Sequence, residues 1–230
     1  MMTIAENLHA IRCRINDAAS RAGRDGEAVR LVAVSKRVPL ERLREAVAAG
    51  QILFGENYLQ EAELKIKALG PGIEWHCIGH LQSNKAKLAA GLFDAVDTVD
   101  RFKLAAALDR QLAETGKLLP VLLQVNIGCE VQKSGVLPEE AEELLRRINA
   151  LPHLDVRGLM TIPPFFEDAE EVRPYFRRLR QMADAFLDKG LLGRRGPLEV
   201  SMGMSGDFEV AVEEGATLVR VGTALFGERL

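Results

Sequence analysis

Short apolar runs alternate with amphipathic stretches along almost the whole chain, and this alternation leaves few folds open to it. Eight of the runs have the length of a strand and lack polar alternation, which indicates strands that are buried on both faces. They span residues 31–36, 52–58, 74–80, 95–100, 121–127, 156–162, 198–205 and 218–226. Buried strands that alternate with helices predict a parallel sheet covered by helices.

The stretches between the runs carry recognisable helix ends. Thr3 and Glu6 match a capping box and open a first helix that ends near Gly23. Pro39 suits the first position of a helix that ends at Gly50. Further helices are predicted from Asp100 to Gly116, from Pro138 to about Ala150, over residues 168–190 and from Asp207 to Gly215. One extra helix therefore precedes the first strand.

Eight strand–helix units in 230 residues fit a compact closed (β/α)8 barrel, the TIM barrel, which typically takes about 250 residues. No linker, low-complexity tract or break in composition divides the chain, so residues 1–230 are predicted to form a single domain. The predicted fold class is α/β, a TIM barrel with an extra N-terminal helix. An open, doubly wound sheet is the alternative that the same alternation allows.

Composition and charge argue against several classes of protein. A net charge of -3 and a pI near 5.9 provide no basic surface for a nucleic acid. No apolar stretch approaches the roughly 20 residues that a membrane span needs, and the first residues show no secretory signal pattern. Cys13, Cys77 and Cys129 are odd in number and far apart, which is typical of reduced thiols. We therefore expect a soluble, cytoplasmic protein with no nucleic-acid or membrane partner.

Lys36 closes the first apolar run, at the end of the predicted strand where a TIM barrel carries its reactive groups. An amine at this position either reaches solvent or sits in a pocket that lowers its pKa. A lysine of the second kind is a nucleophile for aldehydes, as in the Schiff-base chemistry of aldolases and pyridoxal phosphate proteins. The other strand ends add Asn57, His80, Asn126 and Met160, which are predicted to converge on the same mouth.

Two segments near the C-terminus indicate an anion site. Residues 201–207 place the hydroxyls of Ser201 and Ser205 where the seventh strand turns into a helix, and Gly222 and Thr223 follow the eighth strand. Hydroxyls and backbone N–H groups in such loops bind phosphate, and the loops after strands seven and eight form the usual phosphate site of a TIM barrel. A turn that needs these residues only for its geometry is the alternative.

His76 and His80 have a spacing that suggests a metal site. On a strand, however, residues four apart lie roughly 13 Å from each other, which is too far for one ion. No acidic cluster adjoins them in the sequence, so we expect no metal.

Taken together, these segments resemble the YggS/PROSC family, the pyridoxal phosphate homeostasis proteins. The matching motifs are LVAVSK at 31–36, GENY at 55–58, HCIGHLQSNK at 76–85, GLMTIP at 158–163, SMGMSGD at 201–207 and VRVGTALFG at 219–227. They cover nearly the whole chain. The loop 128–132 departs from the more polar sequence that is frequent in the family, so its role stays open.

The resemblance implies the fold of the N-terminal barrel of alanine racemase, with pyridoxal 5'-phosphate (PLP) as the cofactor. Lys36 would be the lysine of the internal aldimine, and Arg220 would face the pyridine nitrogen. The implied phosphate cradle consists of Ser201, Ser205, Gly222 and Thr223, and Asn57 and Met160 would line the cofactor pocket.

Catalytic turnover is not expected. An arginine that faces the pyridine nitrogen keeps it unprotonated and weakens the electron sink that racemisation needs. We also expect no second β-domain, which supplies a catalytic tyrosine in alanine racemases. The predicted function is therefore a monomeric carrier that maintains PLP homeostasis, with PLP and PLP-dependent apoenzymes as partners. A PLP-dependent amino-acid racemase of low activity and a Schiff-base aldolase or sugar-phosphate isomerase are the alternatives.

Overall fold

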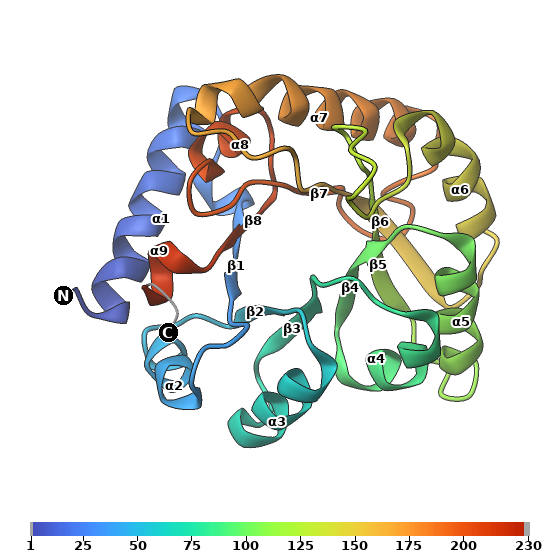
Figure 1. The fold of residues 1–230 in the computed structure, drawn as a ribbon, viewed down its shortest axis with the longest axis horizontal. Coiled ribbons are helices and arrows are strands. Elements are labelled where there is room, and N and C mark those ends of the chain that lie inside the picture. The colour runs from blue at the N-terminus through green and yellow to red at the C-terminus, as the bar shows by residue number, and fades with distance from the viewer. Residues whose placement is uncertain (1, 228–230) are drawn as a thin grey trace.

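The computed structural model describes residues 2–227, and these contain eight parallel strands that close into a barrel (Figure 1). The strands are β1 (Arg30–Val34), β2 (Leu53–Glu56), β3 (Glu74–Cys77), β4 (Ala95–Val99), β5 (Leu119–Gln124), β6 (Leu154–Met160), β7 (Glu199–Ser201) and β8 (Leu218–Val221). Each strand pairs with the next one along the chain, and β8 pairs with β1. This order confirms the predicted TIM barrel and rules out the open, doubly wound sheet.

Helices surround the barrel as an outer ring (Figure 1). Those of the described residues are α1 (Ile4–Arg21), α2 (Leu40–Ala48), α3 (Leu59–Leu69), α4 (Ala86–Leu92), α5 (Phe102–Leu112), α6 (Ala141–Ile148), α7 (Arg173–Asp188), α8 (Phe208–Glu213) and α9 (Thr223–Phe226). Short 3-10 turns precede several of them. The capping box that opens α1 is confirmed, because Thr3 and Glu6 bond reciprocally to each other's backbone N–H. No helix in residues 2–227 is long and apolar enough for a membrane crossing.

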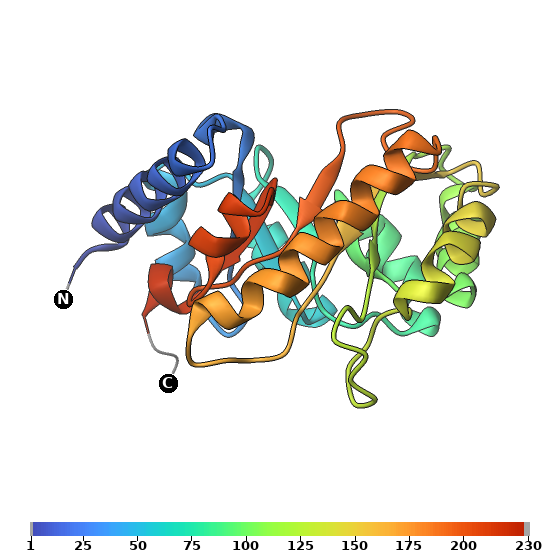
Figure 2. The ribbon, with the colours of Figure 1, turned by 90° about the horizontal axis from the view of Figure 1, so that it is seen from above.

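The extra N-terminal helix completes the outer ring. The helix that follows β8, α9, has a single turn and covers little of the barrel. Helix α1 packs against α8, α9 and α2, and so lies over the junction of β8 and β1 (Figures 1 and 2). A bidentate pair from Arg14 to Glu209, with N–O distances of 3.2 and 2.8 Å, joins α1 to α8. The predicted extra helix is therefore confirmed and replaces a full-length eighth helix.

Some predicted boundaries are wrong. The run 218–226 is not one strand, because β8 ends at Val221 and the chain turns at Gly222 into α9. The run 198–205 contains only three strand residues. Pro39 occupies the N-cap of α2 instead of its first helical position. Asp100 does not cap α5, since its carboxylate is paired with the guanidinium of Arg101.

Two apolar layers stabilise the barrel. The larger one fills the space between strands and helices, where Phe54 stacks on Trp75 with ring centroids 5.3 Å apart. Truncating either ring to alanine would cost about 3–5 kcal/mol of unfolding free energy. The smaller one joins Val32, Leu53, Leu122, Met160 and Leu218 from five different strands. Side chains of five strands can meet only inside the barrel, so its interior is packed and not an open pore.

Candidate functional site

Lys36 lies at the mouth of the barrel, where the structure brings most of the predicted site residues together. Val32 packs in the barrel interior, and Val34 lies on the same face of β1 because side chains alternate along a strand. Lys36 follows in a tight turn that is closed by a hydrogen bond from the Val38 N–H to the Ser35 carbonyl, 3.0 Å long. Its half-buried side chain lines a cavity of about 300 Å³ at the C-terminal ends of the strands.

The walls of this cavity come from loops that are distant in the sequence. They comprise Val34, Lys36, Asn57, Ile78, Ile162, Phe165, Met204, Ser205, Gly206, Arg220, Gly222 and Thr223. Six of the eight predicted site residues are among them, namely Lys36, Asn57, Ser205, Arg220, Gly222 and Thr223. The volume is at the lower end of the range for small-molecule sites, about 300–1,000 Å³. The cavity is therefore large enough for one small ligand.

Hydrogen bonds join the Ser205 hydroxyl to the turn after β8. The Ser205 hydroxyl oxygen accepts from the backbone N–H of Gly222 and of Ala224, each at 3.3 Å. Gly203 makes the approach of this loop possible, because it has a φ of +90° and an added Cβ would lie 2.6 Å from the Cβ of Ala211. Backbone N–H groups and a hydroxyl that converge in this way are suited to bind the oxygens of an anion.

Arg220 places a fixed cation in the cavity wall. Its side chain is buried, and the guanidinium donates to the Ser201 hydroxyl at 2.8 Å and to the Thr161 carbonyl at 2.7 Å. Burial lowers the pKa of Arg220 to about 10, while attraction to Asp97 and Asp207 acts in the opposite direction. The guanidinium therefore stays charged at neutral pH.

Met160 and Ser201, the other two predicted site residues, do not line the cavity. Met160 is fully buried in the barrel interior among Val32 and Leu218. Ser201 is also fully buried, and its hydroxyl contacts the cavity wall only through Arg220. Their predicted contact with a cofactor stays a prediction.

Comparisons with known proteins identify the family to which the chain belongs. A family model described as the alanine racemase N-terminal domain matches residues 7–230. The pyridoxal phosphate homeostasis protein of Aquifex aeolicus is 44% identical over 229 residues, which cover 99% of each chain. That of Escherichia coli K12 is 46% identical over 234 residues, which cover 100% of this chain and 98% of the relative. The chain belongs to the family of pyridoxal phosphate homeostasis proteins, which share the alanine racemase N-terminal domain.

Solved structures extend the likeness to three dimensions. PipY of Synechococcus elongatus, solved with PLP bound, is 38% identical with a TM-score of 0.84, covering 98% of this chain and 100% of PipY. A protein of Bifidobacterium adolescentis described as unknown is 36% identical with a TM-score of 0.90, covering 97% and 94%. Alanine racemase of Clostridium difficile, 15% identical with a TM-score of 0.76, shares the fold over 98% of this chain and 59% of the racemase.

Five apolar residues that line the cavity were not among the predicted site residues, namely Val34, Ile78, Ile162, Phe165 and Met204. Phe165 is the most exposed of them, at 85%. The sequence offers only the aromatic pair Phe165 and Phe166 after Pro163 and Pro164, which does not by itself indicate a cavity.

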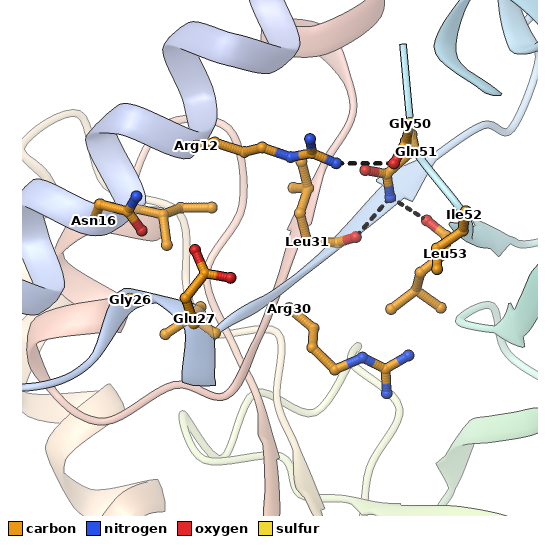
Figure 3. Close-up of a pocket in the computed structure, with 12 residues that line it drawn as sticks. Arg12, Asn16, Gly26, Glu27, Arg30, Leu31, Gly50, Gln51, Ile52 and Leu53 are labelled. Carbon is orange, nitrogen blue, oxygen red and sulfur yellow. Dashed lines mark hydrogen bonds between the residues drawn. The ribbon is translucent and has the colours of Figure 1, made fainter. Parts of the chain in front are cut away.

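A separate cavity of about 500 Å³ lies at the opposite, N-terminal end of the barrel, between α1 and the starts of β1 and β2 (Figure 3). Two of its polar side chains, Arg12 and Gln51, bond to the backbone. Arg12 donates to the Gly50 carbonyl at 3.0 Å, and the Gln51 amide donates to the carbonyls of Leu31 and Leu53 at 2.8 and 2.6 Å (Figure 3). None of the predicted site residues lines it. We interpret these contacts as clamps that hold α1 and two strand starts in place.

No group of three His, Cys, Asp or Glu side chains that could hold a metal ion is found in residues 2–227. His76 is buried inside the barrel and His80 is exposed at its mouth.

Proposed function

We propose that this chain binds PLP reversibly at the mouth of the barrel and contributes to PLP homeostasis in the cytoplasm. The observation that carries this proposal is the cavity in which the Lys36 amine, the Ser205 loop and the Arg220 cation meet. PLP carries an aldehyde, a phosphate and a pyridine nitrogen, and each has a chemically suitable group in this cavity. Membership of the family and the PLP-bound PipY structure support the proposal.

Lys36 is the proposed attachment point. Its Nζ attacks the aldehyde carbon, a C=N bond forms, and the aldehyde oxygen leaves as water with the amine protons. The reverse reaction with water, or exchange with a free amine, releases the cofactor. This Schiff base makes binding strong but reversible, as a carrier requires.

The phosphate would be held by the loops after β7 and β8. Ser205 and Thr223 supply hydroxyls, and the N–H groups of Gly222 and Ala224 already converge on the Ser205 oxygen. The buried Arg220 strengthens a positive potential in the same cavity. Asn57 adds an amide to the wall, where the close approach of Gly79 holds its backbone.

Arg220 also bears on turnover. A bound PLP supplies an electron sink, whose strength depends on a protonated pyridine nitrogen. A permanent cation beside that nitrogen disfavours its protonation. Among residues 2–227, no Asp, Glu, His, Cys or Tyr side chain lines the cavity. We therefore propose carriage of PLP without efficient catalysis, by a monomer whose residues 1–230 act as one domain and which exchanges PLP with apoenzymes.

An absorbance spectrum of the purified protein with PLP tests the attachment. We expect a yellow protein, and borohydride should fix the cofactor covalently to the wild type and to a Lys85→Ala control, whose exposed lysine lies outside the cavity. Lys36→Ala should lose the fixed cofactor entirely. Fixation of equal stoichiometry in Lys36→Ala would overturn the proposed attachment.

Incubation with L-alanine in deuterium oxide tests the absence of turnover. We expect no enzyme-like incorporation of deuterium at Cα and no racemisation. Exchange at an enzyme-like rate that disappears in Lys36→Ala would instead show that the protein is a racemase.

A further inference from the structure

A buried ion cluster lies directly behind Lys36, outside the cavity. The Lys65 ammonium contacts the Glu56 carboxylate at 2.7 Å and the Glu61 carboxylate at 2.6 Å. Glu56 is fully buried, and Lys65 is 6% exposed. Burial raises the pKa of Glu56, and the hydrogen bond and charge of Lys65 act in the opposite direction. None of the three residues lines the Lys36 cavity.

Such a cluster is an unusual choice for stability alone. Desolvation of buried charges offsets much of their mutual attraction, and apolar residues of similar volume frequently stabilise a protein as well or better. Side chains alternate along β2, so Glu56 faces α3, while Gly55 faces the side chains of Val32 and Ile78. Lys65 and Glu61 are one helical turn apart on α3, which brings both beside Glu56.

The cluster bonds to both neighbours of Lys36 in the chain. The Ser35 hydroxyl donates to Glu56 at 2.7 Å, and the Ser35 carbonyl accepts from the Lys65 ammonium at 2.6 Å. On the other side, the Arg37 N–H donates to the Glu61 carboxylate at 2.6 Å. The turn that carries Lys36 is therefore bonded to the cluster before and after the lysine.

That turn needs external support. Arg37 has a φ of +57°, a left-handed conformation that favours glycine and is disfavoured for a residue with a side chain. A disfavoured backbone conformation persists only where surrounding contacts maintain it, and such positions concentrate at functional sites. The bonds of Ser35 and Arg37 to the ion cluster add to the Val38 N–H to Ser35 carbonyl bond within the turn and to the Ser35 N–H bond to the Gly55 carbonyl.

We propose that Glu56, Lys65 and Glu61 are positioning residues for Lys36. The cluster holds the turn in the conformation that presents the Lys36 amine to the cavity, and so favours formation of the bond to the cofactor aldehyde. This inference rests on the proposed PLP binding and deepens it, because it separates attachment of the aldehyde from seating of the phosphate.

The experiment compares two methionine substitutions on α3. Lys65→Met removes the central cation, while Lys67→Met removes the cation of the exposed pair Lys67–Glu63, which has the same four-residue spacing. At PLP concentrations that saturate each protein, absorbance and borohydride fixation give the fraction of bound cofactor that is covalently attached. We expect this fraction to fall about tenfold or more in Lys65→Met and to stay unchanged in Lys67→Met. An equal fraction in both variants would overturn the proposal, even if Lys65→Met melts at a lower temperature.

Substitutions of Glu61 provide a second test if Lys65→Met does not fold. The Glu61 side chain is 25% exposed, so its replacement should disturb folding less than replacement of the buried Lys65. Gln at position 61 still accepts a hydrogen bond from the Arg37 N–H, and Ala does not. We expect Glu61→Gln to retain most covalent attachment and Glu61→Ala to lose it. Equal attachment in the two variants would contradict the role of this hydrogen bond.

Amide hydrogen exchange separates failure of this inference from failure of PLP binding, because it needs no cofactor. In Glu61→Ala without PLP, the Arg37 amide should exchange at least about tenfold faster than in the wild type. Unchanged exchange would show that the Glu61 carboxylate does not hold the Arg37 amide. If the wild type binds no PLP, the proposed function and the role of the ion cluster in attachment are both wrong. Faster exchange in Glu61→Ala would then still show that the cluster holds the turn in place.

Discussion

The two ends of the barrel use charge in different ways. At the N-terminal end, Arg30 pairs with Glu74, and Arg157 pairs with Asp155 at 3.0 Å and lies 3.6 Å from Glu199. At the C-terminal mouth, the lining residues in the described part of the chain include Lys36 and Arg220 but no carboxylate. The charges named at the N-terminal end are paired with one another, whereas the residues that line the mouth include two cations. If PLP binds as proposed, this contrast favours an anionic ligand at the mouth.

The largest expected effect comes from removing the buried cation of the mouth. Arg220→Met leaves the Ser201 hydroxyl and the Thr161 carbonyl without their donor, so we expect a loss of about 3–5 kcal/mol in unfolding free energy. PLP affinity should fall about tenfold or more, because the cavity loses a charge. Urea unfolding and PLP titration measure the two effects.

Arg30→Met is the matched change at the other end. The Arg30 side chain is 40% exposed, so its loss should cost about 1 kcal/mol or less and leave the PLP dissociation constant unchanged. If Arg30→Met weakens PLP binding as much as Arg220→Met does, the contrast between the two ends is wrong.

A histidine inside the barrel makes stability depend on pH. Burial acts to lower the pKa of His76, but the adjacent carboxylates of Asp97 and Glu74 outweigh it and raise the pKa to about 10. Because the pKa is higher in the folded state, this stabilisation is complete below about pH 6.5 and is lost as the pH rises through 10.

The loss should amount to about 2–4 kcal/mol between pH 6.5 and 10. His76→Gln should remove this part of the pH dependence and leave PLP affinity at neutral pH unchanged. Urea unfolding at a series of pH values, with the variant as reference, measures it. Parallel curves for the two proteins would show that His76 is not charged in the folded state.

A smaller effect is expected from the hydroxyl of the anion site. Ser205→Ala should raise the dissociation constant for PLP about tenfold, which corresponds to about 1.4 kcal/mol for one hydrogen bond to a charged group. Pyridoxal has no phosphate, so its affinity should not change. Titrations with both compounds decide the matter, and an equal loss for pyridoxal would place the phosphate elsewhere.

The smallest effect is expected at the cavity of Figure 3. Arg12→Ala removes one hydrogen bond from an exposed guanidinium to the Gly50 carbonyl and should cost about 0.5–1 kcal/mol. PLP titration should show no change. A clear loss of PLP affinity in this variant would mean that the N-terminal end contributes to binding.

Local sequence patterns predict much of the fold, and they also predict several of the residues that line the cavity at the mouth. Most strands lie within runs that are rich in apolar residues, although strands such as β3 and β6 also carry charged side chains. The strand ends of a parallel barrel meet at one mouth, which is how Lys36, Asn57 and Ser205 were predicted. The pattern fails at strand ends, because an apolar run does not reveal where the backbone turns. Residues 218–226 illustrate this, since Gly222 ends β8 inside the run.

Partners that depend on tertiary contacts could not be predicted. Lys65 lies on the buried face of α3, where an apolar residue is expected, and only the approach of Glu56 from β2 accounts for it. His76 pairs with Asp97 across neighbouring strands, so that contact depends on the β3–β4 register. Met160 lies in the packed interior among Val32 and Leu218 and does not line the cavity, so its predicted contact with a cofactor stays a prediction.

A crystal structure of the protein grown with PLP tests most directly whether the mouth of the barrel is the cofactor site. We expect continuous electron density from Lys36 Nζ to the cofactor, with the phosphate against Ser205, Gly222 and Thr223. Cofactor bound in the cavity beside Arg12, or a phosphate seated away from the loops that follow β7 and β8, would contradict this assignment.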